Sequence, residues 1–410
     1  MNDHYDIAIV GAGAAGLAAA RRLRGEPLEV VLLEARDRVG GRAWTIAPRP
    51  GMALDAGCEW LHSATRNVFA PLIEAKGLTL DRTPAHWVRR TSRVGLGAED
   101  SRAFGEAYAR LDVRLEEAAA RGVDAPASDF LEPGGRWNGL LNAVSSWYNG
   151  AEWDGVSVLD YAAYEDTGGN WRVRQGYGAA IASVAGPVDP MLDCSVEAID
   201  HGRAPIGLTT AKGTLTARAA IVSIPTNLLA RGAIRFTPPL PAKVEAAAGV
   251  PLGLADKAFL AVRNPELLSV EGHAFGRADR AATASYFLRP VGLPYVEAYF
   301  GGHLAADLER EGPGALTAFA IDELGALLGS EVRRALTPLA ETAWTADPFA
   351  RGAYSHALPG HAGDRAVLAA PVDGRLFFAG EATHPSFFST AHGAWETGVR
   401  AAEEALAAVC

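Results

Sequence analysis

The sequence contains little cysteine. Only Cys58, Cys194 and Cys410 occur among its 410 residues, an odd number of thiols at wide spacing. Such spacing indicates neither a disulfide framework nor a thiolate metal site. We therefore expect no bound metal and a reducing compartment.

Long apolar runs are also missing. No segment approaches the roughly 20 apolar residues that a membrane-spanning helix needs. The first predicted strand begins within about six residues of Met1, which leaves no room for a signal peptide. The last predicted helix runs to Cys410 and stops. We expect a soluble, cytoplasmic protein that does not bind membranes.

Excess positive charge is a third absence. The formal net charge is −10, which argues against binding to nucleic acid or anionic membranes and is compatible with cationic substrates. Hydrophobic residues make up 49% of the chain and charged residues 21%, as in ordinary globular proteins. The chain is long enough for two domains with buried cores.

A glycine-rich turn near the start carries the strongest local pattern. An apolar run at 7–10 stops at Gly11-Ala-Gly13-Ala-Ala-Gly16, and a helix-forming stretch follows at 17–24. The first glycine permits a tight turn, the second lets the backbone approach a pyrophosphate, and the third lets the helix pack close to the strand. The phosphates would then lie at the positive N-terminus of the helix.

A second apolar strand at 30–33 ends in Glu34, whose carboxylate lies where an acceptor for ribose hydroxyl groups is expected. The glycines alone would also suit a plain turn without a ligand. The complete order of strand, turn, helix, strand and acid favours a dinucleotide site.

The residues after Glu34 decide between dinucleotides. Arg36, Gly40-Gly41-Arg42 and Thr45 resemble the extended motif of the flavin-containing amine oxidase family, which includes monoamine and polyamine oxidases. The resemblance implies FAD as the cofactor. It also implies an α/β fold, with a Rossmann-like FAD-binding domain and an interleaved α+β substrate-binding domain, the amine oxidase or p-hydroxybenzoate hydroxylase-like architecture.

The implied domains are discontinuous. Residues 1–80, 180–240 and 345–410 would form the FAD-binding domain. Residues 81–179 and 241–344 would form the substrate-binding domain. Strands are predicted at 193–199, 208–216, 219–225, 252–260, 286–288, 296–300 and 375–379. Helices are predicted within 64–121 with a break at 82–97, within 315–328 and 331–336, and from 391 onward.

The segment 51–63 resembles the D-x-G-x-x-W-[IL]-H motif of polyamine and spermine oxidases. In those enzymes the backbone of the matching Gly57-Cys58-Glu59-Trp60 stretch lies against the flavin ring, and the matching His62 faces the substrate. The alternative is that Trp60 and His62 are ordinary core residues.

Lys257 lies in a predicted apolar strand, and burying an ammonium group is costly unless it has partners. The position resembles the family lysine that holds a water near flavin N5. The resemblance implies a part in flavin reoxidation or in amine deprotonation, and these two remain open. A surface lysine with a buried stem is the alternative.

Near the end of the chain, Trp344, Asp347 and Tyr354 resemble a further family segment, in which Tyr354 matches one wall of an aromatic cage. Ala353 replaces the cysteine that bonds FAD covalently in monoamine oxidases, so the resemblance implies noncovalent FAD. Thr390 replaces the second cage tyrosine, as it does in polyamine oxidases.

The resemblance implies three sets of site residues. The catalytic residues are Lys257, Tyr354 and His62. The FAD-binding residues are Gly11, Gly13, Ala15, Gly16, Glu34, Ala35, Arg36, Gly41, Arg42, Gly57, Cys58, Glu59, Trp60, Val196, Pro225, Trp344, Gly380, Glu381, Thr390, Ala391 and Ala394. The substrate pocket is formed by Trp60, His62, Phe387, Phe388 and Thr390.

An acidic region formed by Glu152, Asp154, Asp160, Glu165 and Asp166 surrounds two tyrosines. A solvated acidic face is the commoner explanation for such a region, and the wall of a channel that attracts cations is the alternative.

Three functions follow from the sequence. The first is oxidation of a polyamine-like substrate at a C–N bond, with small-molecule amine and O₂ as partners and H₂O₂ as product. The second is an L-amino-acid oxidase or monooxygenase of the same fold, and the third a noncatalytic FAD-stabilised binding module. The sequence does not distinguish a monomer from a homodimer.

Overall fold

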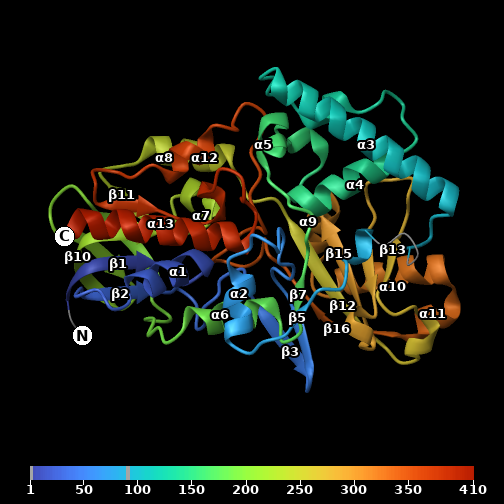
Figure 1. The fold of residues 1–410 in the computed structure, drawn as a ribbon, viewed down its shortest axis with the longest axis horizontal. Helices are drawn as coiled ribbons and strands as arrows, with labels where there is room; N and C mark the ends of the chain where they lie inside the picture. The colour runs from blue at the N-terminus through green and yellow to red at the C-terminus, as the bar shows by residue number, and fades with distance from the viewer. Residues whose placement is uncertain (1–2, 89–92) are drawn as a thin grey trace.

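Two β-sheets lie side by side in the molecule (Figure 1). The protein is described by a computed structural model that covers residues 3–88 and 93–410. The first sheet has seven strands in the order β11-β8-β9-β10-β1-β2, with β17 paired to β10. Its strands are β1 (His4–Val10), β2 (Val30–Leu33), β8 (Val196–Asp200), β9 (Ile206–Thr210), β10 (Gly213–Val222), β11 (Arg235–Thr237) and β17 (Leu376–Phe378).

The second sheet has six strands in the order β16-β12-β15-β14-β13-β6. They are β6 (Arg93–Val94), β12 (Ala255–Val262), β13 (Gly272–Phe275), β14 (Ser285–Leu288), β15 (Tyr295–Gly301) and β16 (Leu336–Glu341). Two short antiparallel pairs join β3 (Thr45–Arg49) to β4 (Met52–Asp55) and β5 (Leu80–Asp81) to β7 (Arg172–Val173).

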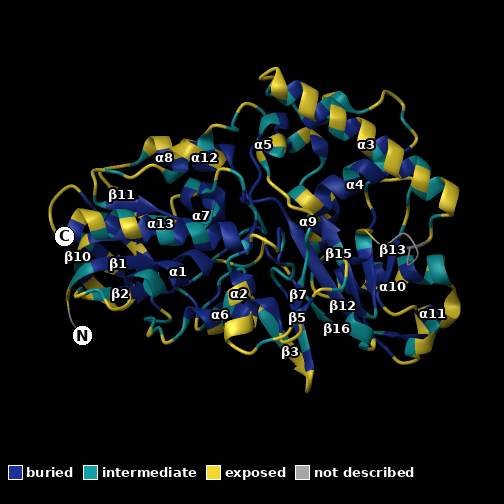
Figure 2. Ribbon diagram, viewed as in Figure 1, coloured by how far each residue is buried: buried dark blue, intermediate teal, exposed yellow. Residues whose placement is uncertain are grey.

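Helices cover both sheets, and in Figure 2 their exposed residues lie mainly on the outside while the strands beneath are buried. The helices are α1 (Ala14–Leu23), α2 (Phe69–Ala75), α3 (Ala98–Ala120), α4 (Asn138–Asn149), α5 (Val158–Ala163), α6 (Tyr177–Ala185), α7 (Thr226–Ala230), α8 (Pro241–Gly249), α9 (Gly302–Glu311), α10 (Ala315–Leu328), α11 (Ser330–Ala335), α12 (Asp364–Ala369) and α13 (Ala391–Val409). In the part of the chain that the structure describes, no helix combines the length and the apolar character that crossing a membrane requires.

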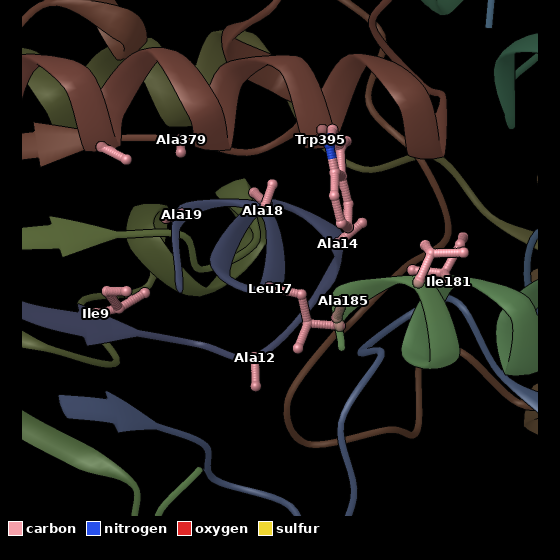
Figure 3. Packing of buried hydrophobic residues seen from close by; sticks show 14 of the residues in the cluster. Ile9, Ala12, Ala14, Leu17, Ala18, Ala19, Ile181, Ala185, Ala379 and Trp395 are labelled. Carbon is pink, nitrogen blue, oxygen red and sulfur yellow. The ribbon is translucent and has the colours of Figure 1, made fainter. Parts of the chain in front are cut away.

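The first helix lies between the sheet and the last helix (Figure 3). Leu17 of α1 and Ile9 of β1 are both fully buried, and Trp395 of α13 belongs to the same core. The two helices approach closely, because a Cβ added at Gly398 would lie 2.1 Å from the carbonyl oxygen of Ala15. Only glycine fits at that position of α13. The N-terminal and C-terminal parts of the chain therefore share one core.

Most of the predicted elements are found. The expected strand–helix–strand unit is present as β1, α1 and β2, with β1 parallel to both β2 and β10. The strands predicted at 252–260, 286–288 and 296–300 correspond to β12, β14 and β15. Helices flank the predicted break at 82–97, of which residues 89–92 lie outside the described residues.

The strand predicted at 208–216 is partly correct, since residues 208–210 lie in β9, the antiparallel partner of β8, but one continuous strand is wrong. The chain turns at 211–212, so that β9 ends at Thr210 and β10 begins at Gly213 as its antiparallel partner. Gly213 has a φ of +118°, and the Thr210 hydroxyl donates to its carbonyl oxygen at 2.8 Å. β10 then continues to Val222 and includes most of the strand predicted at 219–225.

Candidate active site

A large cavity of about 1130 Å³ reaches from the glycine-rich turn after β1 to Lys257 on β12. Its lining comes from both sheets and from the segments that connect them. Of the predicted site residues, all line this cavity except Gly16 and Phe387. Predicted site residues from opposite ends of the chain therefore lie together around one cavity.

The end of the cavity at the carboxyl end of β1 suits a pyrophosphate. Gly13 caps α1 without a side-chain hydrogen bond, so the first N–H groups of the helix are not used by a capping side chain. Gly11 has a φ of +98°, and a Cβ at Gly16 would lie 1.8 Å from the Gly11 carbonyl oxygen. Gly16 therefore packs against the backbone of the turn and does not line the cavity.

Glu34 lies at the end of β2, where a ribose hydroxyl acceptor was predicted. One carboxylate oxygen accepts from the backbone N–H of Ala12 at 2.7 Å, and the other accepts from that of Arg36 at 2.9 Å. A carboxylate has about four lone-pair sites, so each oxygen keeps room for a hydroxyl donor. The Arg36 guanidinium is held by Asp347 at 2.6 Å.

Arg42 and Glu381 form a second fixed pair at the middle of the cavity. Arg42 donates to the carbonyl oxygen of Ala353 at 2.6 Å and to Glu381 at 2.9 Å. Burial raises the pKa of Glu381, but the Arg42 charge and hydrogen bonds from Ser355 and Ser389 outweigh it, so the net pKa is lowered. Glu381 is therefore ionised and fixes the guanidinium. The residues present fit FAD, with the backbone turn for its phosphates and Glu34 for its ribose.

Lys257 lies at the other end of the cavity with its ammonium group buried. Its Nζ donates to the carbonyl oxygen of Asp55 at 3.0 Å and to Glu59 at 2.9 Å, and it contacts a carboxylate oxygen of Glu297 at 2.9 Å. These three acceptors match the three N–H groups of an ammonium. Burial lowers the pKa of Lys257, but the two carboxylates reverse this and raise it above its ordinary value. Lys257 thus remains protonated.

Glu59 and Glu297 form a carboxyl pair around Lys257. Each carboxylate lies 2.9 Å from the Lys257 Nζ, so the two groups are close enough for the charge of one to affect the pKa of the other. Burial, together with the charge of Glu59, raises the pKa of Glu297 to about 8, whereas Lys257 and Arg172 outweigh burial and lower that of Glu59. Glu297 therefore holds a proton at neutral pH.

Sequence reasoning missed Glu297. It lies on β15 within an otherwise apolar run, which is the same signal that singled out Lys257 on β12. Glu59 was predicted only as a backbone contact to FAD, and its side chain proves to be a direct partner of Lys257.

His62 lies in the cavity wall, and its Nδ1 is 2.6 Å from the amide oxygen of Asn170. Burial lowers the pKa of His62, and this effect outweighs the hydrogen bond that Nδ1 donates to Asn170 and the charges of Asp166 and Glu59, all of which raise the pKa. The imidazole is therefore neutral at pH 7.

Aromatic side chains form much of the remaining wall. The Tyr354 hydroxyl lies 3.0 Å from that of Tyr299 and donates to the carbonyl oxygen of Trp147. The Trp60 ring meets Trp87 edge-on at 4.5 Å. The aromatic lining residues are Trp60, Trp87, Phe104, Tyr108, Trp147, Tyr148, Tyr161, Tyr164, Phe275, Phe287, Tyr299, Trp344, Phe349, Tyr354 and Phe388.

Two residues of the predicted substrate pocket have other surroundings. Phe387 is buried behind the cavity, where its ring packs on His384 and His392 at 5.1 and 4.9 Å. The Thr390 hydroxyl donates to the carbonyl oxygen of Phe387 and accepts from the N–H of Gly393, so it caps α13. Thr390 still lines the cavity, as do Ala391 and Ala394 in the first turn of that helix.

The acidic region is not one uniform solvated face. Asp160 is 2% exposed and forms a buried ion pair with Arg365 at 2.6 Å. Glu165 is exposed and pairs with Arg66, whereas Asp166 lines the cavity together with Asp112 and Glu116. The prediction of a solvated face is therefore wrong for Asp160, because a positive charge reaches it from α12.

Comparison with known proteins identifies the family. A model of flavin containing amine oxidoreductases matches residues 129–406, and a model of NAD(P)-binding Rossmann-like domains matches residues 9–74. Polyamine oxidase 2 of Arabidopsis thaliana is 30% identical over 97% of this chain and 87% of its own length. Polyamine oxidase 3 of Oryza sativa subsp. japonica is also 30% identical, over 97% of this chain and 88% of its own.

Solved structures agree on the fold. A structure of putrescine oxidase bound to putrescine matches with a TM-score of 0.78 and 21% identity, over 98% of this chain and 99% of that one. The chain therefore belongs to the flavin containing amine oxidoreductase family, and it is a flavin-dependent amine oxidase whose cofactor is FAD.

Proposed function

We propose that the protein oxidises polyamine-like amines at a C–N bond, with O₂ as the oxidant. The carbon next to nitrogen loses a hydride and the nitrogen loses a proton, which gives an imine, while O₂ is reduced to H₂O₂. Water then hydrolyses the imine to an aldehyde and an amine. Bound FAD supplies the acceptor for the hydride and its two electrons.

The charge of the cavity is the observation that carries this proposal. Among the described residues that line it, seven are acidic, namely Glu34, Glu59, Asp112, Glu116, Asp166, Glu297 and Glu381, and of these Glu297 is protonated at neutral pH. The lysine and arginine residues are Arg36, Arg42 and Lys257, and each is already paired with a carboxylate. Such a cavity attracts cations, and its aromatic walls suit ammonium groups and alkyl chains.

The reacting amine must lose its proton before oxidation. An alkylammonium has a pKa near 10.4, so the neutral amine costs about 4.6 kcal/mol at pH 7 in water. Desolvation by the aromatic walls lowers that cost. Lys257 cannot take this proton because its own pKa is raised. His62 is neutral and lines the cavity, so we propose it as the residue that contacts the amine.

We further propose noncovalent FAD, because Ala353 offers no thiol. The catalytic set proposed is His62, Tyr354 and Lys257, with the last as a fixed cation. Trp60, Phe388 and Thr390 line the proposed substrate pocket, and Phe387 is left out of it.

The two-domain division at the boundaries given above remains our proposal.

An amino-acid oxidase of the same fold is the second candidate. The carboxylate of an amino-acid substrate would need a cation in the cavity wall. Among the described residues that line the cavity, the three lysine and arginine residues already have carboxylate partners. The observation therefore favours amines without a carboxylate.

Peroxide release from the FAD-loaded protein tests the proposal. The panel contains spermine, spermidine, putrescine, benzylamine and L-amino acids at pH 7.5. We expect the largest kcat/KM for a polyamine or diamine. A larger kcat/KM for an L-amino acid would refute the proposal, and an absence of peroxide with every compound despite bound FAD would favour a noncatalytic binding module.

A further inference from the structure

Glu297 lies on the face of β15 that turns toward the cavity. Side chains alternate along a strand, so Glu297 and Tyr299 share one face, and both line the cavity. The residues that alternate with them, Val296, Ala298 and Phe300, belong to the core on the other face of the sheet. A carboxyl group therefore forms part of the cavity wall within an otherwise apolar strand.

Two carboxyl groups share one ammonium group at this part of the wall. An oxygen of Glu59 and an oxygen of Glu297 each lie 2.9 Å from the Lys257 Nζ, and the two carboxyl side chains are only 10% and 8% exposed. One positive charge balances one buried carboxylate, and a second buried carboxylate without a cation of its own is costly. This cluster of three side chains therefore holds one proton and is electrically neutral.

The neighbouring charges place that proton on Glu297. Burial and, next, the charge of Glu59 raise the pKa of Glu297 to about 8, although Lys257 acts in the opposite direction. Burial would also raise the pKa of Glu59, but the charges of Lys257 and Arg172 lower it. Glu59 is therefore ionised at neutral pH and Glu297 is protonated.

The other charged groups near the cluster have partners of their own. Arg172 is held by Asp81 at 2.9 Å and by Glu271 at 3.0 Å. The pKa of Asp55 is raised to about 6, mainly by burial, and its carboxylate accepts from two backbone N–H groups at the start of α6. Neither group supplies a second cation for the cluster.

The remaining titratable neighbours are neutral at pH 7. Burial raises the pKa of Tyr295 and of Tyr299, which lie on the same strand as Glu297. Burial also raises the pKa of Cys58 to about 12 and lowers that of His62. Among these described neighbours, Glu297 is the group that can release a proton near neutral pH.

We propose that Glu297 gives up its proton when the ammonium group of an amine substrate enters the cavity, and that the carboxylate so formed pairs with this cation. This inference rests on the proposed function, because it names the group that recognises the substrate charge in the same cavity. The O–H bond of Glu297 breaks and the proton leaves to solvent, so one positive charge replaces another. An uncharged compound would gain nothing from this exchange, and Glu297 thus determines specificity for cations.

The exchange makes binding depend on pH in a defined direction. A cation within about 4–6 Å lowers the pKa of a carboxyl group by about 1–3 units. Starting from about 8, a fall of about one to two units corresponds to about 0.5–0.7 proton released at pH 7.5 and to about 6- to 20-fold tighter binding at pH 8.5 than at pH 6.5. Affinity rises with pH because the free protein binds more protons than the complex.

Hexamethonium, an alkyl chain with a trimethylammonium group at each end, is the probe. Its charge does not depend on pH, so a released proton must come from the protein, and its quaternary nitrogens cannot be oxidised to imines. Titration calorimetry of the FAD-loaded protein in two buffers of different ionisation enthalpy counts the protons. We expect about 0.5–0.7 proton from the parent protein at pH 7.5 and none from Glu297→Gln, whose amide keeps the size of the side chain.

Glu116→Gln is the matched control, because it removes an exposed carboxyl group from the same cavity wall. It should weaken hexamethonium binding and leave the number of released protons unchanged. If the parent protein releases no proton, if its affinity is the same at pH 6.5 and pH 8.5, or if Glu297→Gln releases as many protons as the parent, the inference is wrong.

Infrared difference spectra of the parent protein give a second measurement, which does not require Glu297→Gln to fold. The C=O band of a protonated carboxyl group should disappear when hexamethonium binds. A carboxyl band that is the same with and without hexamethonium would overturn the inference.

Peroxide release separates the two proposals. If hexamethonium binding releases the proton but no amine of the panel is oxidised, the proposed function fails. If polyamines are oxidised but hexamethonium binding releases no proton, the inference alone fails. With a polyamine that proves to be a substrate, Glu297→Gln should raise KM more at pH 8.5 than at pH 6.5, because only the higher pH ionises Glu297 in the free parent protein.

Discussion

Removing the Lys257 ammonium should destabilise the protein in a pH-dependent manner. Lys257→Met keeps the length and apolar stem of the side chain but leaves Glu59 and Glu297 without their cation. Glu297 already holds a proton at pH 7, so the charge that loses its nearest cation is that of Glu59, which keeps only the attraction of Arg172. A buried carboxylate in this position is costly unless it takes up a proton.

Proton uptake sets the size of the effect. The ordinary pKa of Glu59 is 4.5, so protonating it at pH 7 costs about 3.4 kcal/mol, and at pH 5 only about 0.7 kcal/mol. The lost hydrogen bond to Asp55 adds about 1 kcal/mol. We expect a loss of about 4 kcal/mol at pH 7 and about 2 kcal/mol at pH 5. For a chain of 410 residues these correspond to about 5 °C and 2 °C in Tm.

The sign follows from proton binding. In Lys257→Met the folded-state pKa of Glu59 lies above the unfolded value, so the folded state binds more protons between the two pKa values. This stabilisation is present at low pH and is lost as the pH rises through the folded-state pKa. The deficit relative to the parent protein therefore grows from pH 5 to pH 7.

The assay is thermal unfolding of the FAD-saturated protein at pH 5, 6 and 7. Lys257→Met/Glu59→Gln should recover most of the loss, because no charge is then left uncompensated. Lys243→Met is the matched control, since this buried lysine donates to the carbonyl oxygens of Val367 and Leu368 and its deficit should be flat over this range. A deficit of Lys257→Met that does not change with pH, or that Glu59→Gln does not relieve, would refute the reasoning.

Two further changes test other parts of the site. Gly16→Val should abolish FAD retention, because its Cβ would lie 1.8 Å from the Gly11 carbonyl oxygen, and flavin absorbance per protein after desalting measures this. Glu297→Gln should flatten the pH dependence of Tm, because the raised folded-state pKa of Glu297, about 8, makes the parent protein lose stability as the pH rises from about 4.5 to 8. An unchanged slope would argue against a protonated Glu297 at neutral pH.

The sequence predicts the parts of the site that depend on local patterns. The order of β1, the glycine turn, α1 and Glu34 follows from periodicity and from the conformational freedom of glycine, which act within about 30 residues. Lys257 was also predicted from a local pattern, because a charged side chain within an apolar strand needs buried partners.

The partners themselves could not be predicted. Glu297 reaches Lys257 because β15 pairs with β12 in one particular register, with Phe259 opposite Glu297. Asn170 reaches His62 through the pairing of Leu61 with Trp171. No local propensity encodes such registers, because they depend on which segments pack together across the chain. The misplaced strand at 208–216 shows the same limit, since two residues of turn were enough to reverse the chain.

The joint between α1 and α13 has a consequence for biosynthesis. Gly398 rests on Ala15, Arg42 pairs with Glu381 across 339 residues of sequence, and β17 completes the sheet beside β10. At a synthesis rate of about 5–20 residues per second, the glycine turn waits roughly 20–70 s for these segments. The glycine turn is therefore synthesised early, whereas the segments that complete its surroundings are synthesised last. A nascent chain released before residue 376 would carry its phosphate-binding loop without the groups that close the cavity around FAD.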